Sequence, residues 1–222
     1  MSTSSSSKNP TQDGLNPRSL SYADDFIPAV ESVRTAREQA VLEGAPALSS
    51  GTCATLTMLA KAVDAQAVVE IGTSTGASGL AFFAGMNEHG VLTSIDVQTQ
   101  WQVEARRAFT AEKIPTRRFR LIPGSPLDVL NNLRDGAYDI VFVNGDKLEY
   151  AEYLDQALRL LRPGGMVILN EVLWQNKVAD PSNEEDEALI IRETLAAVLE
   201  SETLTSAMLP VGEGLLVGIK TR

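Results

Sequence analysis

From Ala67 onward, short apolar runs alternate with longer stretches in which apolar residues have helical spacing. The apolar runs cover 67–71, 91–95, 119–122, 138–143 and 166–170. The helical stretches between them cover 77–86, 102–113, 126–133 and 150–161. Nearly continuous apolar strands that alternate with helices are typical of a parallel sheet covered on both faces. The pattern therefore predicts an α/β, doubly wound, Rossmann-like domain.

The C-terminal part follows a different pattern. After one more helical stretch at 185–201, two apolar runs in 204–220 are joined by the short sequence VGEG. A connection this short between two strands is typical of an antiparallel hairpin. We therefore expect a mostly parallel seven-stranded sheet that ends in an antiparallel hairpin.

The N-terminal part precedes this alternation. Residues 1–20 are rich in Ser, Asn and Pro and have too few apolar side chains to form a core, so we expect a disordered tail. Residues 21–44 have the spacing of one helix closed by Gly44, and a second helix is expected at 51–63. Residues 21–222 then form a single domain whose N-terminal helices occupy 21–66.

Composition restricts the function and the compartment. The formal net charge of −10 disfavours non-specific binding to nucleic acid or anionic lipid, because both are polyanions. Cys53 is the only cysteine, so an internal disulfide is impossible and a reducing compartment is expected. No apolar run approaches the roughly 18–20 residues that span a bilayer, and the first residues of the sequence lack the apolar stretch typical of a secretory signal. By elimination, we expect a cytoplasmic protein with no membrane partner.

A glycine-containing turn follows the first strand. Gly72 and Gly76 permit a sharp turn and a close approach of a ligand to the backbone. The Gly-Lys-Ser/Thr ending of an ATP-binding Walker A loop is absent. The glycines also follow the spacing G-x-x-x-G-x-x-G rather than the dinucleotide-binding G-x-G-x-x-G.

Two acidic residues stand at the ends of the first two strands. Asp96 could accept hydrogen bonds from ribose hydroxyls, as in a dinucleotide site. Glu70 places a carboxylate beside the loop, where it disfavours a pyrophosphate and suits a cationic ligand such as S-adenosylmethionine. A plain strand–helix turn with two solvated acids is the alternative.

Five segments together resemble the S-adenosylmethionine-dependent O-methyltransferases related to catechol and caffeoyl-CoA methyltransferases. The resemblance is carried by VVEIGTSTGASGL, GVLTSIDV, YDIVFVNGDKLEY, LRLLRPGGMVILNEVLW and LPVGEGLLVGIK, and it is strongest to a small actinobacterial branch. It extends from about residue 36 to the C-terminus. The resemblance implies methyl transfer from S-adenosylmethionine to a hydroxyl of a small, aromatic acceptor.

The resemblance also implies a set of cofactor contacts. They would surround the methionine part, the ribose and the adenine, in that order along the chain. The implied residues are Leu48, Glu70, Gly72, Thr73, Ser78, Asp96, Val97, Ser125 with its neighbour Pro126, and Asn144.

The expected metal site departs from the family pattern. Metal-dependent members hold a divalent cation with two Asp and one Asn, but here the matching positions are Asn144, Asn170 and Glu171. Mg²⁺ prefers charged oxygen ligands, so the loss of a carboxylate should weaken its binding. Asp146 could compensate if the loop turned it inward. We favour the interpretation that these residues form a hydrogen-bonded site without a metal, and Mg²⁺ binding is the alternative.

Lys147 matches the lysine that family members place near the acceptor hydroxyl, and with Asn144 it is the predicted catalytic residue. A lysine exposed to water keeps its proton at neutral pH, so a role as base requires burial or a neighbouring cation. The alternative is a solvated lysine paired with Glu149 or Asp146.

Other reactive residue types have plainer interpretations. His89, the only histidine, is expected on a surface turn, which argues against a Ser–His–Asp triad. Cys53 is expected to pack within a helix, and Trp101 to pack at a helix start. Trp174 could wall an aromatic acceptor pocket or pack in the core.

Three other functions stay open. They are a methyltransferase for a hydroxylated tRNA base, a nicotinamide-dependent oxidoreductase, and a non-catalytic S-adenosylmethionine-binding relative. The acidity argues against the first, and the glycine spacing and terminal hairpin against the second. The resemblance further implies a homodimer that pairs through the N-terminal helices and the C-terminal region.

Overall fold

Seven strands form one sheet in the computed structural model, which describes residues 14–221. The strands are β1 (Ala67–Ile71), β2 (Val91–Asp96), β3 (Phe119–Pro123), β4 (Tyr138–Val143), β5 (Leu161–Asn170), β6 (Leu204–Leu209) and β7 (Leu215–Lys220). Their order in the sheet is β3-β2-β1-β4-β5-β7-β6. The first five strands are parallel, and β7 runs antiparallel to both β5 and β6. The predicted sheet and its terminal hairpin are confirmed.

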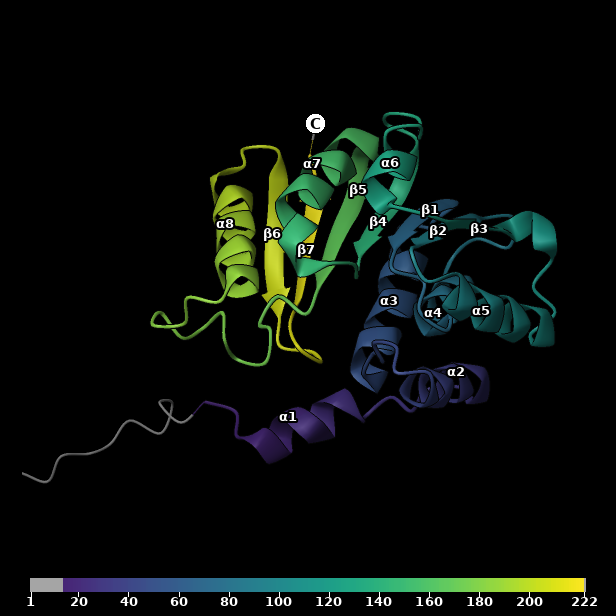
Figure 1. Ribbon diagram of the computed structural model, residues 1–222, viewed down its shortest axis with the longest axis horizontal. Coiled ribbons are helices and arrows are strands. Elements are labelled where there is room, and N and C mark those ends of the chain that lie inside the picture. The colour runs from purple at the N-terminus through teal and green to yellow at the C-terminus, as the bar shows by residue number, and fades with distance from the viewer. Residues whose placement is uncertain (1–13, 222) are drawn as a thin grey trace, which may run out of the picture.

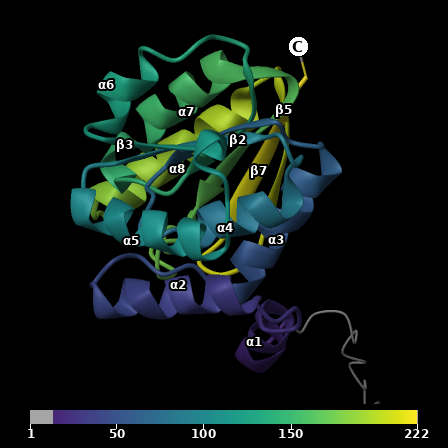
Figure 2. The same cartoon turned by 90° about the vertical axis from the view of Figure 1, so that its right-hand side faces the viewer.

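Helices cover both faces of this sheet (Figures 1 and 2). One layer contains α6, α7 and α8, and the opposite layer contains α3, α4 and α5, with α2 packed outside α4 and α5. The α-helices are α1 (Pro17–Asp24), α2 (Glu31–Leu42), α3 (Ser50–Ala62), α4 (Ala77–Gly85), α5 (Thr99–Ala111), α6 (Pro126–Leu130), α7 (Tyr150–Leu160) and α8 (Asp186–Glu200). Two short 3₁₀ helices, η1 (Thr116–Arg118) and η2 (Lys147–Glu149), complete the elements.

The core has one half on each side of the sheet. Side chains of a strand point alternately to the two faces, so Val68 packs with the α3–α5 side and Val69 with the α6–α8 side. The same alternation places Phe142 on the first side and Val143 on the second. All four side chains are fully buried, which explains why these strands are continuous apolar runs in the sequence.

The N-terminal helices differ from the prediction. The single helix expected at 21–44 is wrong, because α1 ends at Asp24 and α2 starts at Glu31, with Pro28 between them. Proline lacks a backbone N–H and pushes the preceding residue out of the helical region, so it separates the two helices. Gly44 closes α2 as expected, with φ of +64°.

Helix α1 starts earlier than the predicted domain boundary. The Asn16 side chain accepts a hydrogen bond of 2.9 Å from the Ser19 amide, and Pro17 occupies the first helical position. Both residue types favour a helix start. The tail predicted for 1–20 therefore overlaps α1 at its end, and residues 1–13 lie outside the described part of the chain. None of the helices within 14–221 combines the length and apolar character needed to cross a bilayer.

Candidate active site

The carboxyl ends of β1, β2, β4 and β5 lie side by side and carry the predicted polar residues. Ligands of open α/β sheets bind beyond these strand ends. The sheet register places Glu70 on β1 directly beside Ser94 on β2, near the end of both strands. The next strands end just before Asn144 and at Asn170. The fold thus brings residues from four separate sequence segments to one edge.

Glu70 is a fully buried carboxyl group. Its Oε2 accepts a hydrogen bond of 2.5 Å from the Ser94 hydroxyl, while Oε1 has no hydrogen-bond partner among the described residues. Burial raises the pKa of Glu70 to about 7; Ser78 and Ser94 oppose this shift, and the nearby Asp96 adds to it. An unsatisfied buried carboxylate oxygen costs free energy, so this site is suited to a cationic hydrogen-bond donor.

Asp96 ties the glycine turn to the end of β2. Its Oδ2 accepts from the Ser74 amide at 3.0 Å, and its Oδ1 accepts from the Gln98 amide at 2.8 Å. Burial raises the pKa of Asp96, and the hydrogen bonds from Gln98, Ser74 and Thr73 oppose that shift. Each carboxylate oxygen can accept more than one hydrogen bond, so Asp96 keeps capacity for a ligand.

Gly72 is required by the packing of the protein itself. Its φ is +92°, and a Cβ atom there would lie 2.3 Å from the backbone oxygen of Asn144. A Cβ atom at Gly76 would lie 3.0 Å from atoms of both Ala105 and Phe109 of α5, a tight contact. These contacts explain the glycine spacing as packing of the turn against the tip of β4 and against α5.

The remaining predicted cofactor residues occupy three kinds of position. Thr73 and Ser78 are buried in the turn and at the start of α4, and the Thr73 hydroxyl lies 2.6 Å from that of Ser94. Val97 and Ser125 are exposed beyond the ends of β2 and β3. Leu48 is buried in the loop before α3, next to the Pro46 carbonyl that accepts from Ser74 Oγ at 2.9 Å.

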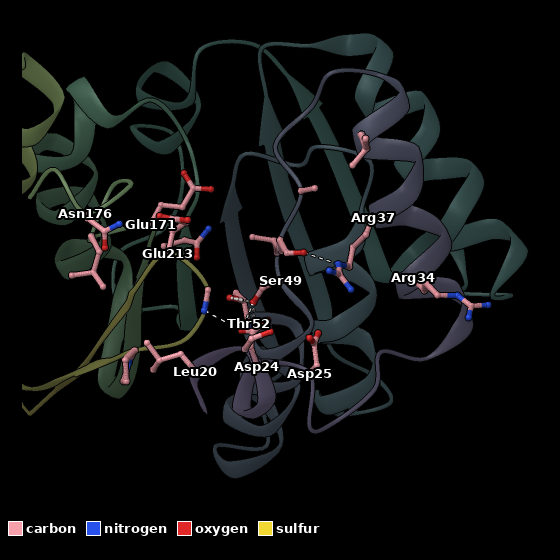
Figure 3. A pocket seen from close by; sticks show the side chains of 18 of the residues that line it. Leu20, Asp24, Asp25, Arg34, Arg37, Ser49, Thr52, Glu171, Asn176 and Glu213 are labelled. Atoms are coloured by element: carbon pink, nitrogen blue, oxygen red, sulfur yellow. Dashed lines mark hydrogen bonds between the residues drawn. The ribbon is translucent and has the colours of Figure 1, made fainter. Parts of the chain in front are cut away.

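A cavity of about 700 Å³ opens beside these strand ends (Figure 3). Glu171 and Glu213 lie on one side of it, and Asp24, Ser49 and Arg37 lie on the other. Its walls come from α1, α2, the start of α3, the end of β5 and the turn between β6 and β7. Leu48, Asn170 and Glu171 are the predicted site residues that line it. The cavity is large enough for a small organic molecule.

The cavity walls contain residues that the sequence did not single out. Arg37 donates to the Leu48 carbonyl at 2.6 Å and to the Ser50 hydroxyl at 2.7 Å, which fixes the loop before α3. Asp24 Oδ1 accepts from the Ser49 hydroxyl at 2.7 Å and from the Gly212 amide at 3.1 Å. Asp24 therefore joins α1, α3 and the β6–β7 turn around the opening, a contact between segments too distant in sequence to be predicted.

Asn144 and Asn170 are bonded to each other. The side-chain amide of Asn170 donates to Oδ1 of Asn144 at 2.8 Å, and both residues are buried. The backbone N–H of Asn144 donates to the backbone carbonyl of Ile71 at 2.8 Å, and Tyr150 Oη donates to the backbone carbonyl of Asn170 at 2.8 Å. These bonds hold the tips of β1, β4 and β5 in register.

Lys147 is buried and pairs with Glu171. Its Nζ lies 2.8 Å from Glu171 Oε2, and the two side chains are 8% and 21% exposed. The ammonium also lies 5.0 Å from the ring centre of Tyr150 and 5.3 Å from that of Trp174, so two aromatic faces cover it. The alternative of a solvated lysine paired with Glu149 or Asp146 is wrong. Asp146 instead caps η2 by accepting from the Leu148 amide at 3.0 Å, and Glu149 accepts from Tyr153.

The residues at the expected metal position do not form a fitting donor set for Mg²⁺. Glu171 is the only carboxylate of the three, and Lys147 already neutralises it. Oδ1 of Asn144 accepts from Asn170, and Asp146 is exposed and turned to its own helix, so it does not compensate. Among residues 14–221, no group of three or more His, Cys, Asp or Glu is arranged to hold a metal ion.

The segment after β5 has an unusual backbone. Glu171, Trp174, Gln175 and Asn176 all have left-handed φ values, between +42° and +66°. Non-glycine residues rarely adopt this conformation, and such strain is concentrated at functional sites. Glu171 and Asn176 line the cavity, so this segment shapes its rim.

The residues with plainer interpretations lie as expected. His89 is exposed on the turn between α4 and β2. Cys53 is buried within α3, and burial raises the pKa of its thiol to about 11, which leaves it protonated and inert at neutral pH. Trp174 is half-buried, packs against the core on the α6–α8 side and faces Lys147. Its core-packing interpretation is therefore supported.

Known proteins resemble this chain in sequence and in fold. A family model described as O-methyltransferase matches residues 27–221. A relative from Mycobacterium sp. (strain JLS), named provisionally as an O-methyltransferase, is 38% identical over 201 residues, which cover 90% of this chain and 91% of the relative. A solved Corynebacterium glutamicum protein is 28% identical with a TM-score of 0.84, over 91% of this chain and 95% of its own. The O-methyltransferase TomG from Streptomyces achromogenes, solved with S-adenosylmethionine, is 22% identical with a TM-score of 0.82, over 91% and 95%.

Proposed function

Because the chain belongs to the O-methyltransferase family, we propose that it transfers a methyl group from S-adenosylmethionine to a hydroxyl of a small, aromatic acceptor. The observation that carries the choice of methyl donor is the unpartnered Oε1 of Glu70 at the tip of β1. When bound, S-adenosylmethionine supplies an electrophilic methyl group on a sulfonium. TomG, which shares the fold, was solved with this molecule.

The donor would be held along the tips of the first three strands. Glu70 fits its cationic amino group, because a cation satisfies Oε1 and favours the ionised carboxylate. Asp96 has free acceptor capacity for the ribose hydroxyls. Val97 and Ser125 lie beyond the ends of β2 and β3, where they can border the adenine. Thr73, Ser78, Gly72 and Leu48 complete the surroundings by packing and hydrogen bonding.

The acceptor would occupy the cavity lined by Leu48, Asn170 and Glu171. Asn144 joins this cavity to the donor site, since it bonds to Asn170 on one side and to the Ile71 carbonyl on the other. Lys147 places a positive charge directly behind Glu171. These residues orient the acceptor oxygen relative to the donor, and such positioning accounts for much of the rate of a two-substrate reaction.

Calorimetry with S-adenosylmethionine, S-adenosylhomocysteine and NAD, each titrated into the full chain, tests the proposal. We expect saturable binding of the first two and none of NAD. A matched pair of variants sharpens the test: Asp96→Ala should lose binding at least tenfold, whereas Asp146→Ala, at an exposed position, should bind as the wild type does. Binding of NAD alone would replace the proposal with an oxidoreductase.

Activity is tested with labelled S-adenosylmethionine and a panel of hydroxylated aromatic compounds. Label transfer to a compound of this panel supports the proposed acceptor class. Label transfer only to hydroxylated tRNA would assign the acceptor to nucleic acid instead. Donor binding without transfer to either would favour a non-catalytic relative.

We also propose a homodimer that pairs through the N-terminal helices. Tyr22, Phe26, Ile27 and Val30 in and after α1 are more than half exposed, as are Val41 and Leu42 of α2. Exposed apolar side chains in one region favour association. Sedimentation of the wild type and of a Phe26→Ser/Val41→Ser variant tests whether the dimer forms and whether it depends on these side chains. The cytoplasmic location stays a prediction.

A further inference from the structure

We propose that the Lys147–Glu171 ion pair replaces the divalent cation at this reaction centre, so that the chain acts without a metal ion. The inference rests on the proposed function, because it concerns the acceptor side of the same site. It starts from the disagreement between the metal position that the family resemblance implies and the side chains that the structure places there.

The charges at the expected metal position are already balanced. Asn144 and Asn170 are neutral amides, so Glu171 contributes the only negative charge at the three expected ligand positions. The Lys147 ammonium lies 2.8 Å from that carboxylate and neutralises it. No excess negative charge is left at these positions to offset the cost of dehydrating Mg²⁺, which binds mainly through carboxylates in proteins.

The ammonium of Lys147 is held firmly in place. Lys147 is 7% exposed, and the aromatic rings of Tyr150 and Trp174 lie 5.0 and 5.3 Å from its Nζ. Glu171 reaches it from a left-handed backbone conformation, with φ of +56°. A charge that is buried, paired and covered by two rings is a fixed part of the site. It holds the Glu171 carboxylate in a fixed position at the cavity wall.

The other oxygen donors near this position already accept hydrogen bonds. Oδ1 of Asn144 already accepts from the Asn170 amide at 2.8 Å. Asp146, the nearest additional carboxylate in sequence, is exposed and accepts from the Leu148 amide. A metal ion would therefore have to break one hydrogen bond and one ion pair before it gained its ligands.

The proposal also changes which acceptors the site can use. A divalent cation can bind two neighbouring oxygens of one acceptor, whereas a single ammonium behind Glu171 imposes no such requirement. One hydroxyl is then sufficient for the acceptor, and a neighbouring oxygen is not needed.

The test is a titration of the full chain with Mn²⁺ in the presence of saturating S-adenosylhomocysteine, followed by electron paramagnetic resonance. We expect wild type, Glu171→Gln and the exposed control Asp146→Asn to bind Mn²⁺ equally weakly. We expect Lys147→Met to bind roughly tenfold more tightly or better, because removing a unit charge this close to the site favours a cation. The variant N144D/N170D/E171N, which restores two Asp and one Asn, should gain a tight site.

Two outcomes would overturn the proposal. One is a loss of Mn²⁺ affinity of tenfold or more in Glu171→Gln, which would make Glu171 a metal ligand. The other is an unchanged affinity in Lys147→Met, which would show that the ammonium does not occupy the place of the cation. If N144D/N170D/E171N fails to fold, the two single variants decide alone. Failure of S-adenosylhomocysteine to bind in calorimetry would instead contradict the proposed function.

Discussion

The Ser94 hydroxyl donates a hydrogen bond of 2.5 Å to Oε2 of Glu70, and both residues are fully buried between neighbouring strands. This single contact satisfies one oxygen of the carboxylate and leaves the other without a partner among the described residues. Burial raises the pKa of this carboxyl group to about 7 against the opposing effect of the Ser94 hydrogen bond, so Glu70 titrates in the physiological range.

Glu70 should make the ligand-free protein less stable at alkaline pH. Its folded-state pKa is raised above the usual value of 4.5, so its stabilising contribution is complete below pH 4.5 and is lost as pH rises through about 7. Urea unfolding should show Glu70→Gln to be more stable than the wild type by about 3 kcal/mol at pH 8.5, with the difference vanishing near pH 4.5. Equal stability of the two proteins at both pH values would contradict the burial argument.

The same carboxyl group should couple donor binding to pH. A cationic amino group favours the ionised form of Glu70, so the affinity for S-adenosylhomocysteine should rise as pH increases from 6 to 8. Glu70→Gln should bind at least tenfold more weakly at pH 8 and lose most of this pH dependence. Calorimetry at several pH values measures both effects. A pH slope that persists in Glu70→Gln would assign the proton to another group.

Gly72→Ala should be strongly destabilising. The left-handed φ of +92° costs about 1–3 kcal/mol with a side chain, and the contact of the new Cβ with the Asn144 oxygen at 2.3 Å adds to it. Gly136→Ala is a matched control, because its φ is +61° but a Cβ there would meet no atom of the described chain within 4 Å. Thermal unfolding should show a clearly larger loss for Gly72. Equal losses of stability in the two variants would mean that backbone strain alone, without the contact to Asn144, accounts for the effect.

The Lys147–Glu171 pair should be coupled in stability. Removing one partner leaves a mostly buried charge, so Glu171→Gln and Lys147→Met should each lose about 1–3 kcal/mol of unfolding free energy. The double variant should lose less than the sum, because it leaves no unpaired charge. Methyl transfer by Lys147→Met should fall roughly tenfold to hundredfold. Strict additivity of the two stability losses would show that the pair is not coupled.

Asp24 should hold α1 against the cavity rim. All side chains of α1 are exposed or half-buried, so its attachment depends strongly on the bonds of Asp24 to Ser49 and to the Gly212 amide. Asp24→Ala should speed amide hydrogen exchange in 17–24 with little change in the central strands. The exposed neighbour Asp25 provides the control variant Asp25→Ala. Unchanged exchange in α1 would mean that other contacts hold this helix.

Much of the fold could be predicted because the strands are buried on both faces. Continuous apolar runs such as 138–143 mark such strands, and the acids at their ends mark the ligand edge. The break between α1 and α2 was missed because helical spacing continues across Pro28, and only the backbone restriction of proline reveals it.

The partner of Lys147 was missed for a different reason. Closeness in sequence favours Asp146 and Glu149 as partners, but η2 turns Asp146 toward its own backbone. Glu171 reaches Lys147 because β4 and β5 are neighbours and because Glu171 adopts a left-handed conformation. The strand order predicts that β4 and β5 are neighbours. The spacing of residues in the sequence does not predict the left-handed conformation of Glu171. Ser94, by contrast, could have been identified by pairing β2 with β1 residue by residue.

The left-handed run at 174–176 makes this rim a good place to begin engineering. Glycine adopts that conformation without a steric penalty, so replacing the exposed Gln175 with glycine would relieve roughly 1–2 kcal/mol of backbone strain, of which glycine's greater loss of chain entropy on folding offsets roughly 0.5–1 kcal/mol. That reserve could offset the destabilisation caused by enlarging the neighbouring walls. A combinatorial library that starts from Gln175→Gly would then tolerate more wall changes, and a broader range of acceptor shapes, than one built on the native chain.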